Sequence, residues 1–324
     1  MSFISADSVD DLLRKVFTAL LKSKSRVSPT KGDNGEIFGI LLELKDPRAR
    51  LSRAESRSVI YSCLGEFLWY MSGSNSLDFV QYYITRYDEY SEEDGTVHGA
   101  YGPRLFGKDG LNQVENVIRK LETNPASRKA VIQLFDARDL EKDYKDVPCT
   151  CTLQFVIRNK FLHMETHMRS NDAFMGLPHD IFCFTMIQEI LANRLGVRLG
   201  TYKHSVGSLH LYDKDAERAQ RFLNEGFQDP VPMPAMPKGD QLHQIGILLE
   251  IEGKIRNGAV IDASFPELSD YWGDIARLLA IKKEVDPKNI SRVKRQMKSK
   301  TYTTFIRKTQ DRVAPEAVTP DFFK

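Results

Sequence analysis

Cysteine is scarce in this sequence. The four cysteines, at positions 63, 149, 151 and 183, are too few for a disulfide scaffold, and they lack the paired Cys-x-x-Cys spacing of a structural zinc site. We therefore expect free thiols and no metal, as in a reducing compartment. The first residues, with Asp10 and Asp11 close behind, do not resemble a signal peptide, so we expect a cytoplasmic protein.

An excess of charge of one sign is also missing. The 324 residues include 46 Lys and Arg against 44 Asp and Glu, which gives a net charge of +2. Such a balance creates no long-range field for nucleic acid. No apolar run reaches the roughly 18 residues of a membrane span. We therefore expect neither nucleic acid nor membrane as a partner, and a small anion held at a local basic site stays compatible with the sequence.

Helical and strand-like segments are mixed along the chain. Apolar residues at helical spacing predict a helix over 9–21 with Ser8 as its cap, and a mostly buried helix over 57–72. We expect a loop at 28–35, further helices at 186–195 and 270–284, and strands at 37–44, 130–135, 150–157, 205–212 and 244–251. A Pro-rich stretch at 228–239 is the strongest break in the chain. Helices and strands do not alternate strictly, which favours an α+β fold.

Two segments are candidates for chemistry. Cys149 stands in the segment 147–155, at a proline-led entry to a strand. A thiol at the end of a rigid element suits a nucleophile, although most cysteines are small buried hydrophobic residues. The segment 169–180 is the densest polar cluster, and Arg169 can bind a phosphate through two hydrogen bonds or stabilise a nearby thiolate. A capped, salt-bridged loop is the alternative for this segment.

Other polar residues, taken singly, are compatible with either a functional or a structural role. Glu66 lies among apolar neighbours, where a carboxylate is rarely buried without a partner or a task. His210 and Tyr212 share one face of a predicted strand and can hydrogen-bond a sugar hydroxyl, or serve the structure alone. Arg128 and Lys129 precede a strand, either as a phosphate-binding pair or as solvated surface.

The order and spacing of these residues are more specific than any one of them. Over roughly residues 35–225 the chain resembles the thymidylate synthase superfamily. The matching positions are Glu66 with Trp69, Asp88 with Gly102, Ser127 with Arg128, Pro148 with Cys149, Arg169 with Ser170, Asp172 and 176–178, and Gly207 with His210 and Tyr212. The resemblance implies an α+β fold with a large mixed sheet, flanking helices and a sheet-mediated homodimer. Residues 1–226 would form the catalytic core, and residues 227–324 would complete the domain with a strand and helices.

The resemblance also implies catalytic roles. Cys149 would add to C6 of a pyrimidine nucleoside monophosphate, and Glu66 would organise water and proton transfers. Tyr101 would help to move the C5 proton. Asp172 would contact the pterin of a reduced folate, the second partner that the family requires.

The implied binding roles concern the phosphate and the sugar. The phosphate would be bound by Arg169 and Ser170, and the sugar 3′-hydroxyl by His210 and Tyr212. Arg128 and Lys129 correspond to an Arg-Arg pair that reaches a phosphate across the homodimer, so the active sites would be shared. Lys129 departs from that pair, because lysine lacks the planar fork of arginine.

One departure from the family bears on the base. Thymidylate synthases carry an asparagine two residues after Gly-Leu-Pro, and this chain has Asp180. Asparagine fits O4 and N3–H of uracil, whereas an aspartate can accept from N4–H₂ of cytosine and, if protonated, complete the second bond. Aspartate at this position resembles the deoxycytidylate and cytidylate hydroxymethylases. A helix N-cap before 181–184 is the alternative role of Asp180.

Other departures bear on water and on closure of the site. The family's Trp-Asp-Glu-Trp is replaced by 87–90, in which Tyr87 and Tyr90 leave room for water beside the folate and the methylene intermediate. The family's Arg-Thr-Gly loop is replaced by 29–32, so Arg26 or Lys31 would supply that phosphate contact. The chain ends in 318–324 rather than in the family's short apolar tail.

We therefore predict a CMP or dCMP 5-hydroxymethylase that uses 5,10-methylenetetrahydrofolate and no metal. A thymidylate synthase acting on dUMP is the alternative within the family. A non-catalytic nucleotide-binding protein is the alternative from another class. A Cys-dependent hydrolase is disfavoured, because no His–Asp pair stands at a motif position suited to activating Cys149.

Overall fold

A mixed sheet organises the fold. The computed structural model of the chain describes residues 2–29, 32–57, 59–107, 110–259 and 262–313. In this part, seven strands form one sheet in the order β1-β3-β7-β6-β5-β4, with β2 paired to β3. The strands are β1 (Ser2–Ala6), β2 (Arg26–Val27), β3 (Asn34–Leu44), β4 (Val131–Gln133), β5 (Thr150–Arg158), β6 (Phe161–Asp172) and β7 (Arg198–Tyr212). Only β1 with β3 and β6 with β7 are parallel among these described pairs. The predicted α+β fold with a large mixed sheet is confirmed.

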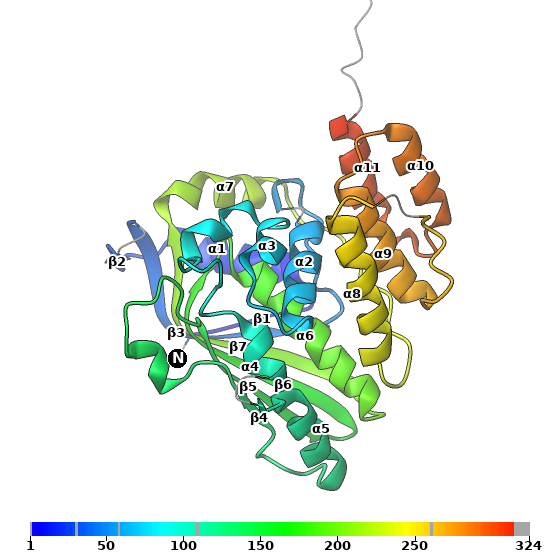
Figure 1. Cartoon of the computed structure of the whole chain (residues 1–324). Helices are drawn as coiled ribbons and strands as arrows, with labels where there is room; N and C mark the ends of the chain where they lie inside the picture. The colour runs from blue at the N-terminus through cyan, green and yellow to red at the C-terminus, as the bar shows by residue number, and fades with distance from the viewer. Residues whose placement is uncertain (1, 30–31, 58, 108–109, 260–261, 314–324) are drawn as a thin grey trace, which may run out of the picture. The chain divides into compact units, whose positions relative to one another are not determined.

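Helices cover one face of this sheet (Figure 1). That layer contains α1 (Val9–Leu21), α2 (Ile60–Met71), α6 (Leu177–Arg194) and α7 (Asp213–Asn224). Shorter elements complete the first part of the chain: η1 (Glu55–Arg57), α3 (Leu77–Gln81), η2 (Thr85–Tyr90), α4 (Tyr101–Phe106), α5 (Gln113–Thr123) and η4 (Ala137–Leu140).

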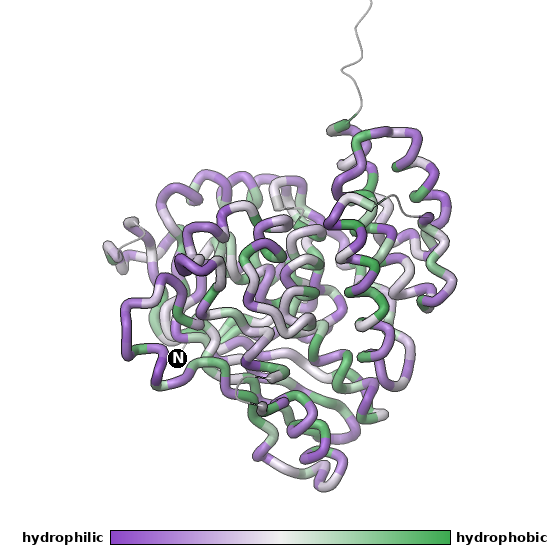
Figure 2. Tube along the Cα trace, viewed as in Figure 1, coloured by the Kyte–Doolittle hydropathy of each residue, from purple (hydrophilic) through white to green (hydrophobic). Residues whose placement is uncertain are grey.

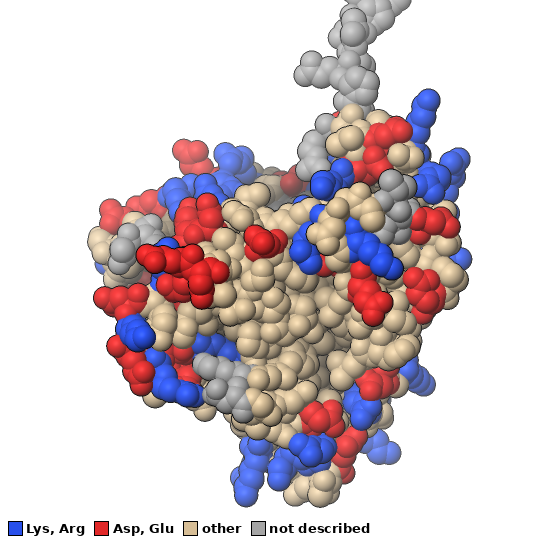
Figure 3. Space-filling model, viewed as in Figure 1, with Lys and Arg blue, Asp and Glu red and all other residues tan. Residues whose placement is uncertain are grey.

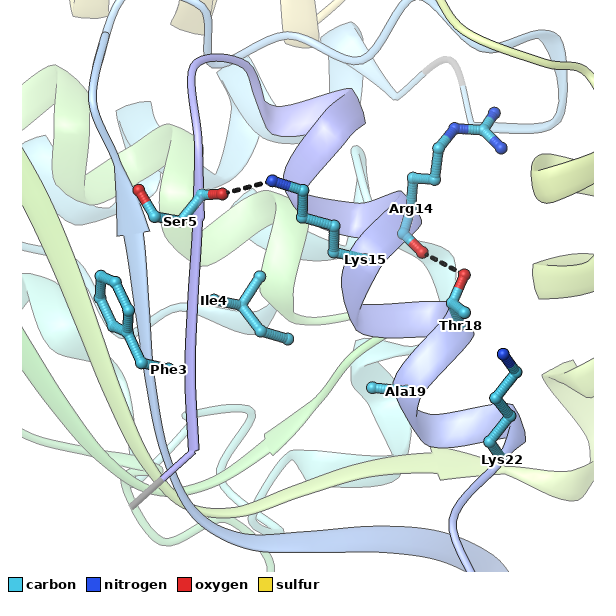
Figure 4. Close-up of a pocket in the computed structure, with 8 residues that line it drawn as sticks. All are labelled: Phe3, Ile4, Ser5, Arg14, Lys15, Thr18, Ala19 and Lys22. Atoms are coloured by element: carbon cyan, nitrogen blue, oxygen red, sulfur yellow. Dashed lines mark hydrogen bonds between the residues drawn. The ribbon is translucent and has the colours of Figure 1, made fainter.

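The N-terminal helix forms as its sequence predicts. The apolar stripe of α1 is buried, and Ser8 Oγ accepts a hydrogen bond from the backbone N–H of Asp11 at 3.2 Å, which caps the helix. On the outer side, Lys15 Nζ donates to the backbone oxygen of Ser5 at 2.6 Å across a shallow hollow between α1 and β1 (Figure 4). The helix is thereby tied to the first strand as well as to the core.

The helix α6 is longer than the predicted helix over 186–195. It begins at Leu177, and every residue from Leu177 to Ala192 is buried. A helix buried on all sides has no polar face, so periodicity alone does not reveal where it begins. The added turns carry Asp180 near the start of the helix.

The predicted strand over 244–251 is wrong. These residues lie in the helix α8 (Leu242–Arg256), in which Ile245, Leu248, Ile251 and Ile255 are buried at helical spacing. A short apolar run is compatible with either a strand or a helix, and the full length of the buried pattern decides for a helix.

The chain divides into two compact units, 1–243 and 244–324. The described part of the second unit contains most of α8, with α9 (Asp270–Lys282), α10 (Pro287–Gln296), η5 (Lys300–Tyr302) and α11 (Thr303–Val313). The largely hydrophilic α10 buries only Ile290 and Val293 (Figure 2). Within this unit Asp274 accepts from the backbone N–H groups of Lys298 and Ser299 at 2.9 and 2.8 Å. The division after residue 226 stays a prediction, and the tail 318–324 lies outside the described residues.

Charges of both signs share the surface. Lys and Arg side chains are interspersed with Asp and Glu on the face in Figure 3, in keeping with the small net charge. None of the described helices has both the length and the apolar character needed to cross a membrane.

Candidate active site

Cys149 lies immediately before β5, on a backbone that is held from both sides. Thr150 begins the strand, and the register of its pairing with β6 shifts between Thr150 and Thr152. The side chain of Arg169, on β6, donates from Nε to the oxygen of Pro148 at 3.0 Å and from a terminal nitrogen to the oxygen of Val147 at 2.8 Å. The thiol therefore stands on a rigid turn beside a cation, an environment that favours a reactive cysteine.

Tyr101 is anchored to the residue that follows the cysteine. Its hydroxyl oxygen accepts from the backbone N–H of Thr150 at 3.1 Å and from Thr150 Oγ1 at 2.9 Å. Burial raises the pKa of Tyr101 well above its usual range, so the phenol keeps its proton. The phenol hydrogen is then available for an acceptor close to Cys149.

A cavity of about 720 Å³ opens beside Cys149, within the range of small-molecule sites. Eleven of the predicted site residues line it: Glu66, Tyr87, Tyr90, Tyr101, Cys149, Arg169, Ser170, Asp172, Asp180, His210 and Tyr212. The fold therefore brings together residues from α2, η2, α4, α6 and three strands or their ends. Arg128 and Lys129 are not among the lining residues, and both are exposed.

Glu66 is a buried carboxyl group in the cavity wall. It lies in α2 and is 7% exposed, and its Oε1 accepts from the hydroxyl of Tyr70 at 2.7 Å. A second hydrogen bond comes from Tyr87. Burial raises the pKa of Glu66 to about 7, and the nearby Asp146 adds to the rise against the effect of the two tyrosines. The group can therefore exchange a proton near neutral pH.

Asp180 is the second buried acid of the wall. It lies in the first turn of α6, whose N-cap is Gly176, so the alternative N-cap role of Asp180 is wrong. Its Oδ2 accepts from Nδ2 of Asn171 at 2.7 Å. Burial raises the pKa of Asp180 well above its usual range, and the charge of Glu66 raises it further. The protonated, neutral form of Asp180 is therefore favoured relative to an exposed aspartic acid.

A buried hydrogen-bond chain orients Asn171. Its Oδ1 lies 3.2 Å from Nε2 of His204, and His204 Nδ1 lies 2.7 Å from the hydroxyl of Tyr202. Burial lowers the pKa of His204 to about 3, so the ring is neutral and can give its one hydrogen, at Nε2, to Asn171. The Asn171 amide is then turned with its NH₂ group toward Asp180.

The two acids, the anchored phenol and the cysteine therefore line one cavity. A family model described as thymidylate synthase matches residues 13–246. The chain belongs to the thymidylate synthase family. Members of this family transfer a one-carbon unit to a pyrimidine nucleotide with a reduced folate as co-substrate. The chain is therefore an enzyme, a one-carbon transferase that acts on a pyrimidine nucleotide.

In this member of the thymidylate synthase family, further site residues gather where β6 and β7 end side by side, with Asp172 and His210 in register. His210 and Tyr212 lie at the end of β7 with their rings edge to face and 4.9 Å between centroids. Asp172 ends β6, and its Oδ1 accepts from the backbone N–H groups of Phe174 and Met175 at 2.8 and 3.0 Å. Burial raises the pKa of Asp172. These polar groups therefore line one region of the cavity, at the adjoining ends of two strands.

The replaced loop near the N-terminus is partly described. Arg26 pairs with Asp213 and is not among the residues that line the cavity, whereas Pro29 is. Lys31 lies outside the described residues. In the described part of the chain, no group of three or more His, Cys, Asp or Glu side chains is arranged to hold a metal ion.

Several lining or supporting residues were not predicted from the sequence. Tyr70 donates to Glu66, Asn171 donates to Asp180, and Asp146 lies in the cavity wall three residues before Cys149. The sequence did contain a signal for Asn171, because this polar residue directly follows Arg169 and Ser170 in the densest polar cluster. No comparable local signal marks His204, which reaches the site from a neighbouring strand.

Proposed function

We propose that this chain is a cytidine 5′-monophosphate 5-hydroxymethylase, acting on CMP or dCMP with 5,10-methylenetetrahydrofolate as co-substrate. The observation that carries the proposal is the buried carboxyl group of Asp180, at a position where thymidylate synthases carry an asparagine. It lies in the wall of the cavity that also contains Cys149, and it accepts a 2.7 Å hydrogen bond from Asn171.

The base-binding step supports cytosine. Cytosine carries a lone pair at N3, whereas uracil carries a hydrogen there. Because burial raises the pKa of Asp180 well above its usual range and so favours the protonated acid, the group can donate to N3 while a carboxyl oxygen accepts from N4–H₂. When a thiolate attacks C6, electron density moves toward N3, so an acid at this edge stabilises the charge as it develops. With uracil, two bonds form only if the proton moves to the other carboxyl oxygen, so that the O–H donates to O4 and the free oxygen accepts from N3–H. The hydrogen bond from Asn171 to Oδ2 disfavours that exchange.

The first half of the reaction uses the two groups nearest to C6 and C5. Cys149 adds to C6, which makes C5 nucleophilic. The bound folate supplies the one-carbon unit to C5. Tyr101, fixed by Thr150, helps to carry away the C5 proton. Release of the folate then leaves an exocyclic methylene group on C5 of the pyrimidine.

The second half of the reaction is the addition of water. The carboxyl group of Glu66 and the hydroxyl of Tyr87 form a polar pair in the cavity wall. Such a pair can hold a water molecule, whereas an indole at position 87 would cover the same wall with an apolar ring. Water added to the methylene carbon yields a 5-hydroxymethyl product and leaves the folate as tetrahydrofolate.

The chemistry of the cavity fits a reduced folate. Asp172 offers a carboxylate, already oriented by two backbone N–H groups, to the N–H groups of a pterin. Tyr90 lines the same cavity and lies 5.6 Å from Tyr87, centroid to centroid, so it offers an aromatic face for the flat ring.

The phosphate site supports a homodimer. Arg169 and Ser170 line the cavity, but Arg128 and Lys129 are exposed and outside its lining. We propose that they reach the phosphate in the active site of a second copy, through pairing of the two sheets. Residues 1–226 would then be the catalytic core of each copy.

One experiment separates the candidate activities. The purified protein is incubated with 5,10-methylenetetrahydrofolate and, separately, with CMP, dCMP, UMP and dUMP, and the product masses are measured. A hydroxymethyl group on a cytosine nucleotide, without formation of dihydrofolate, is the expected result. A methyl group on dUMP with dihydrofolate would establish a thymidylate synthase, and no exchange of the C5 hydrogen with any nucleotide would establish a non-catalytic binding protein.

A further inference from the structure

Asp146 is a carboxylate of the cavity wall that the proposed mechanism leaves without a role. It lies on the loop that leads to Cys149, and this loop is held at several points. The ring of Tyr144 stacks on His98 at 3.5 Å and 4°, and the backbone N–H of Lys145 donates to Glu92 Oε1 at 2.9 Å. The two bonds from Arg169 to the carbonyls of residues 147 and 148 hold the other end. Asp146 is therefore presented to the cavity by a fixed backbone.

The side chain of Asp146 packs against Gly99 and lies within electrostatic reach of the proposed water-binding pair. A Cβ atom added to Gly99 would overlap its carboxyl group, so the carboxylate rests against the Gly99 backbone, two residues before Tyr101. On the other side, its charge acts on both Glu66 and Tyr87. The carboxylate thus stands near the proposed water-binding pair.

We propose that Asp146 is the base that accepts a proton from the water that adds to the methylene intermediate. This inference rests on the proposed hydroxymethylation. The water oxygen forms a bond to the exocyclic carbon, and its proton passes to the Asp146 carboxylate. The electron pair of the methylene double bond moves into the ring toward N3. It then returns to form the C5–C6 double bond and expels the sulfur of Cys149 as a thiolate, with no net oxidation or reduction.

Glu66 alone is less suited to this step. Its Oε1 is already occupied by Tyr70, and Tyr87 donates to the same group, so it is built to orient water. At neutral pH it also carries a proton for part of the time, because its pKa is about 7. A second carboxylate close by supplies the proton acceptor that the pair otherwise lacks.

The test compares two fates of the methylene intermediate. An added thiol such as 2-mercaptoethanol attacks the same carbon as a thiolate and needs no base. In Asp146→Asn we expect hydroxymethyl formation to fall about 100-fold, in the usual range for loss of a general base, while the thioether product and exchange of the C5 hydrogen persist. A change confined to the overall structure would lower all three together. Equal loss of all three in Asp146→Asn, or an unchanged product ratio, would overturn the proposal.

Two further variants keep the test independent of folding. Gly99→Ala would displace the carboxylate without removing it and should move the product ratio in the same direction. Asp143→Asn removes the same charge from an exposed position on the same loop and should leave the ratio unchanged. Thermal unfolding and nucleotide binding are measured for all variants, and a ratio that moves equally in Asp143→Asn would count against a specific role of Asp146.

The product formed by the wild-type protein separates a failure of the proposed function from a failure of the role of Asp146. If it forms no hydroxymethyl product from CMP or dCMP, the proposed function is wrong and the role of Asp146 falls with it. If it forms that product and Asp146→Asn forms it at the same rate, only the role of Asp146 is wrong.

Discussion

Nδ2 of Asn171 lies 2.7 Å from Oδ2 of Asp180, and this bond determines what position 180 offers to a base. Nε2 of the neutral His204 ring lies 3.2 Å from Asn171 Oδ1, and the tautomer with its hydrogen at Nε2 holds the amide with its NH₂ group toward Asp180. One oxygen at position 180 is therefore always used as an acceptor. The other carboxyl oxygen, Oδ1, remains available to form a hydrogen bond with a base.

Replacing Asp180 with Asn should shift base preference from cytosine toward uracil. The new amide oxygen would take the bond from Asn171, which leaves the amide NH₂ group to face the base. That group can donate to O4 of uracil but meets another donor at N4 of cytosine. We expect a loss of about 1–3 kcal/mol in transition-state binding for cytosine nucleotides, or roughly 10–100-fold in kcat/KM.

The measurement is kcat/KM for CMP, dCMP, UMP and dUMP on both proteins. Asp78→Asn is a matched control, since Asp78 is an exposed acid in the first turn of α3 and does not line the cavity. If Asp180→Asn keeps the cytosine preference of the parent, base selection lies elsewhere and the case against a dUMP enzyme collapses.

Titration of Glu66 should make the protein less stable as pH rises. Its pKa is raised from 4.5 to about 7, so the folded state binds more protons than the unfolded state between these values, and stability falls across that window. The loss is about 3 kcal/mol between pH 4.5 and pH 8. Glu66→Gln cannot titrate, so its stability relative to the parent should rise by about this amount between pH 5 and pH 8.

Urea unfolding at the two pH values measures this difference. Glu93→Gln, at an exposed loop position, serves as the control and should follow the parent at both. An equal stability difference between Glu66→Gln and the parent at pH 5 and pH 8 would show that Glu66 does not titrate in this range. Loss of hydroxymethyl formation in Glu66→Gln is expected at both values.

Much of the fold and site could be predicted because the signals are local. The apolar stripe of α1 and its cap at Ser8 can be read from adjacent residues, and the segment around Cys149 and the segment around Arg169 are each contiguous in the chain. Such features depend on spacing within one element, which the sequence displays directly.

The rest depends on contacts between distant segments. The helix α6 is buried on every side, so its first turns carry no amphipathic pattern, and the apolar run of α8 fits two periodicities. The orientation of Asn171 comes from His204 on the neighbouring strand, and the place of Asp146 comes from its packing against Gly99. Register and packing of this kind are set by the tertiary structure.

Replacing Cys149 with Ser should abolish turnover and leave nucleotide binding nearly intact. A hydroxyl is a much weaker nucleophile than a thiolate, so the rate should fall below about a hundredth of the parent rate. The rate is measured by product formation, and binding by calorimetry with the nucleotide alone. Ala at Cys63, Cys151 or Cys183 should lower stability rather than chemistry, since Cys63 and Cys183 are buried and Cys151 lies within β5. A variant Cys149→Ser that retains more than this rate rules out covalent catalysis as the main route.

If active sites are shared across the dimer, mixing two inactive variants should restore enzymatic activity. In a hybrid of Cys149→Ser with Arg128→Ala, one site would combine the intact cysteine of one chain with the intact arginine of the other. Random mixing gives half hybrids with one working site of two, so about a quarter of the parent activity should return in the mixture, and about half in the isolated heterodimer. Mixing differently tagged chains and isolating the heterodimer provides the sample. Proven heterodimers without activity would contradict the contact of Arg128 across the dimer.

The tyrosines at positions 87 and 90 should decide the fate of the methylene intermediate. Tyr87 donates to Glu66 and packs edge-on against Trp69 with ring centroids 5.3 Å apart. Tyr90 is half-buried at the cavity wall, so a larger ring can be accommodated there. Tyr90→Trp, and to a lesser extent Tyr87→Trp, should exclude water and slow hydroxymethyl formation, with more of the thiol-trapped product.

Tyr87→Phe isolates the hydroxyl from the size of the ring. It keeps the packing against Trp69 but removes one donor to Glu66, so the water should be held less firmly. We expect hydroxymethyl formation to fall about tenfold, the lower end of the effect of losing a buried hydrogen bond to a charged group, with the C5 hydrogen exchange unchanged. The ratio of hydroxymethyl to thioether product at a fixed thiol concentration measures the effect in each variant. The ratio and the overall rate could instead be the same as in the parent in all three variants, Tyr87→Phe, Tyr87→Trp and Tyr90→Trp. In that case the two tyrosines do not control the entry of water. The hydroxymethyl product must then be explained by other residues of the cavity.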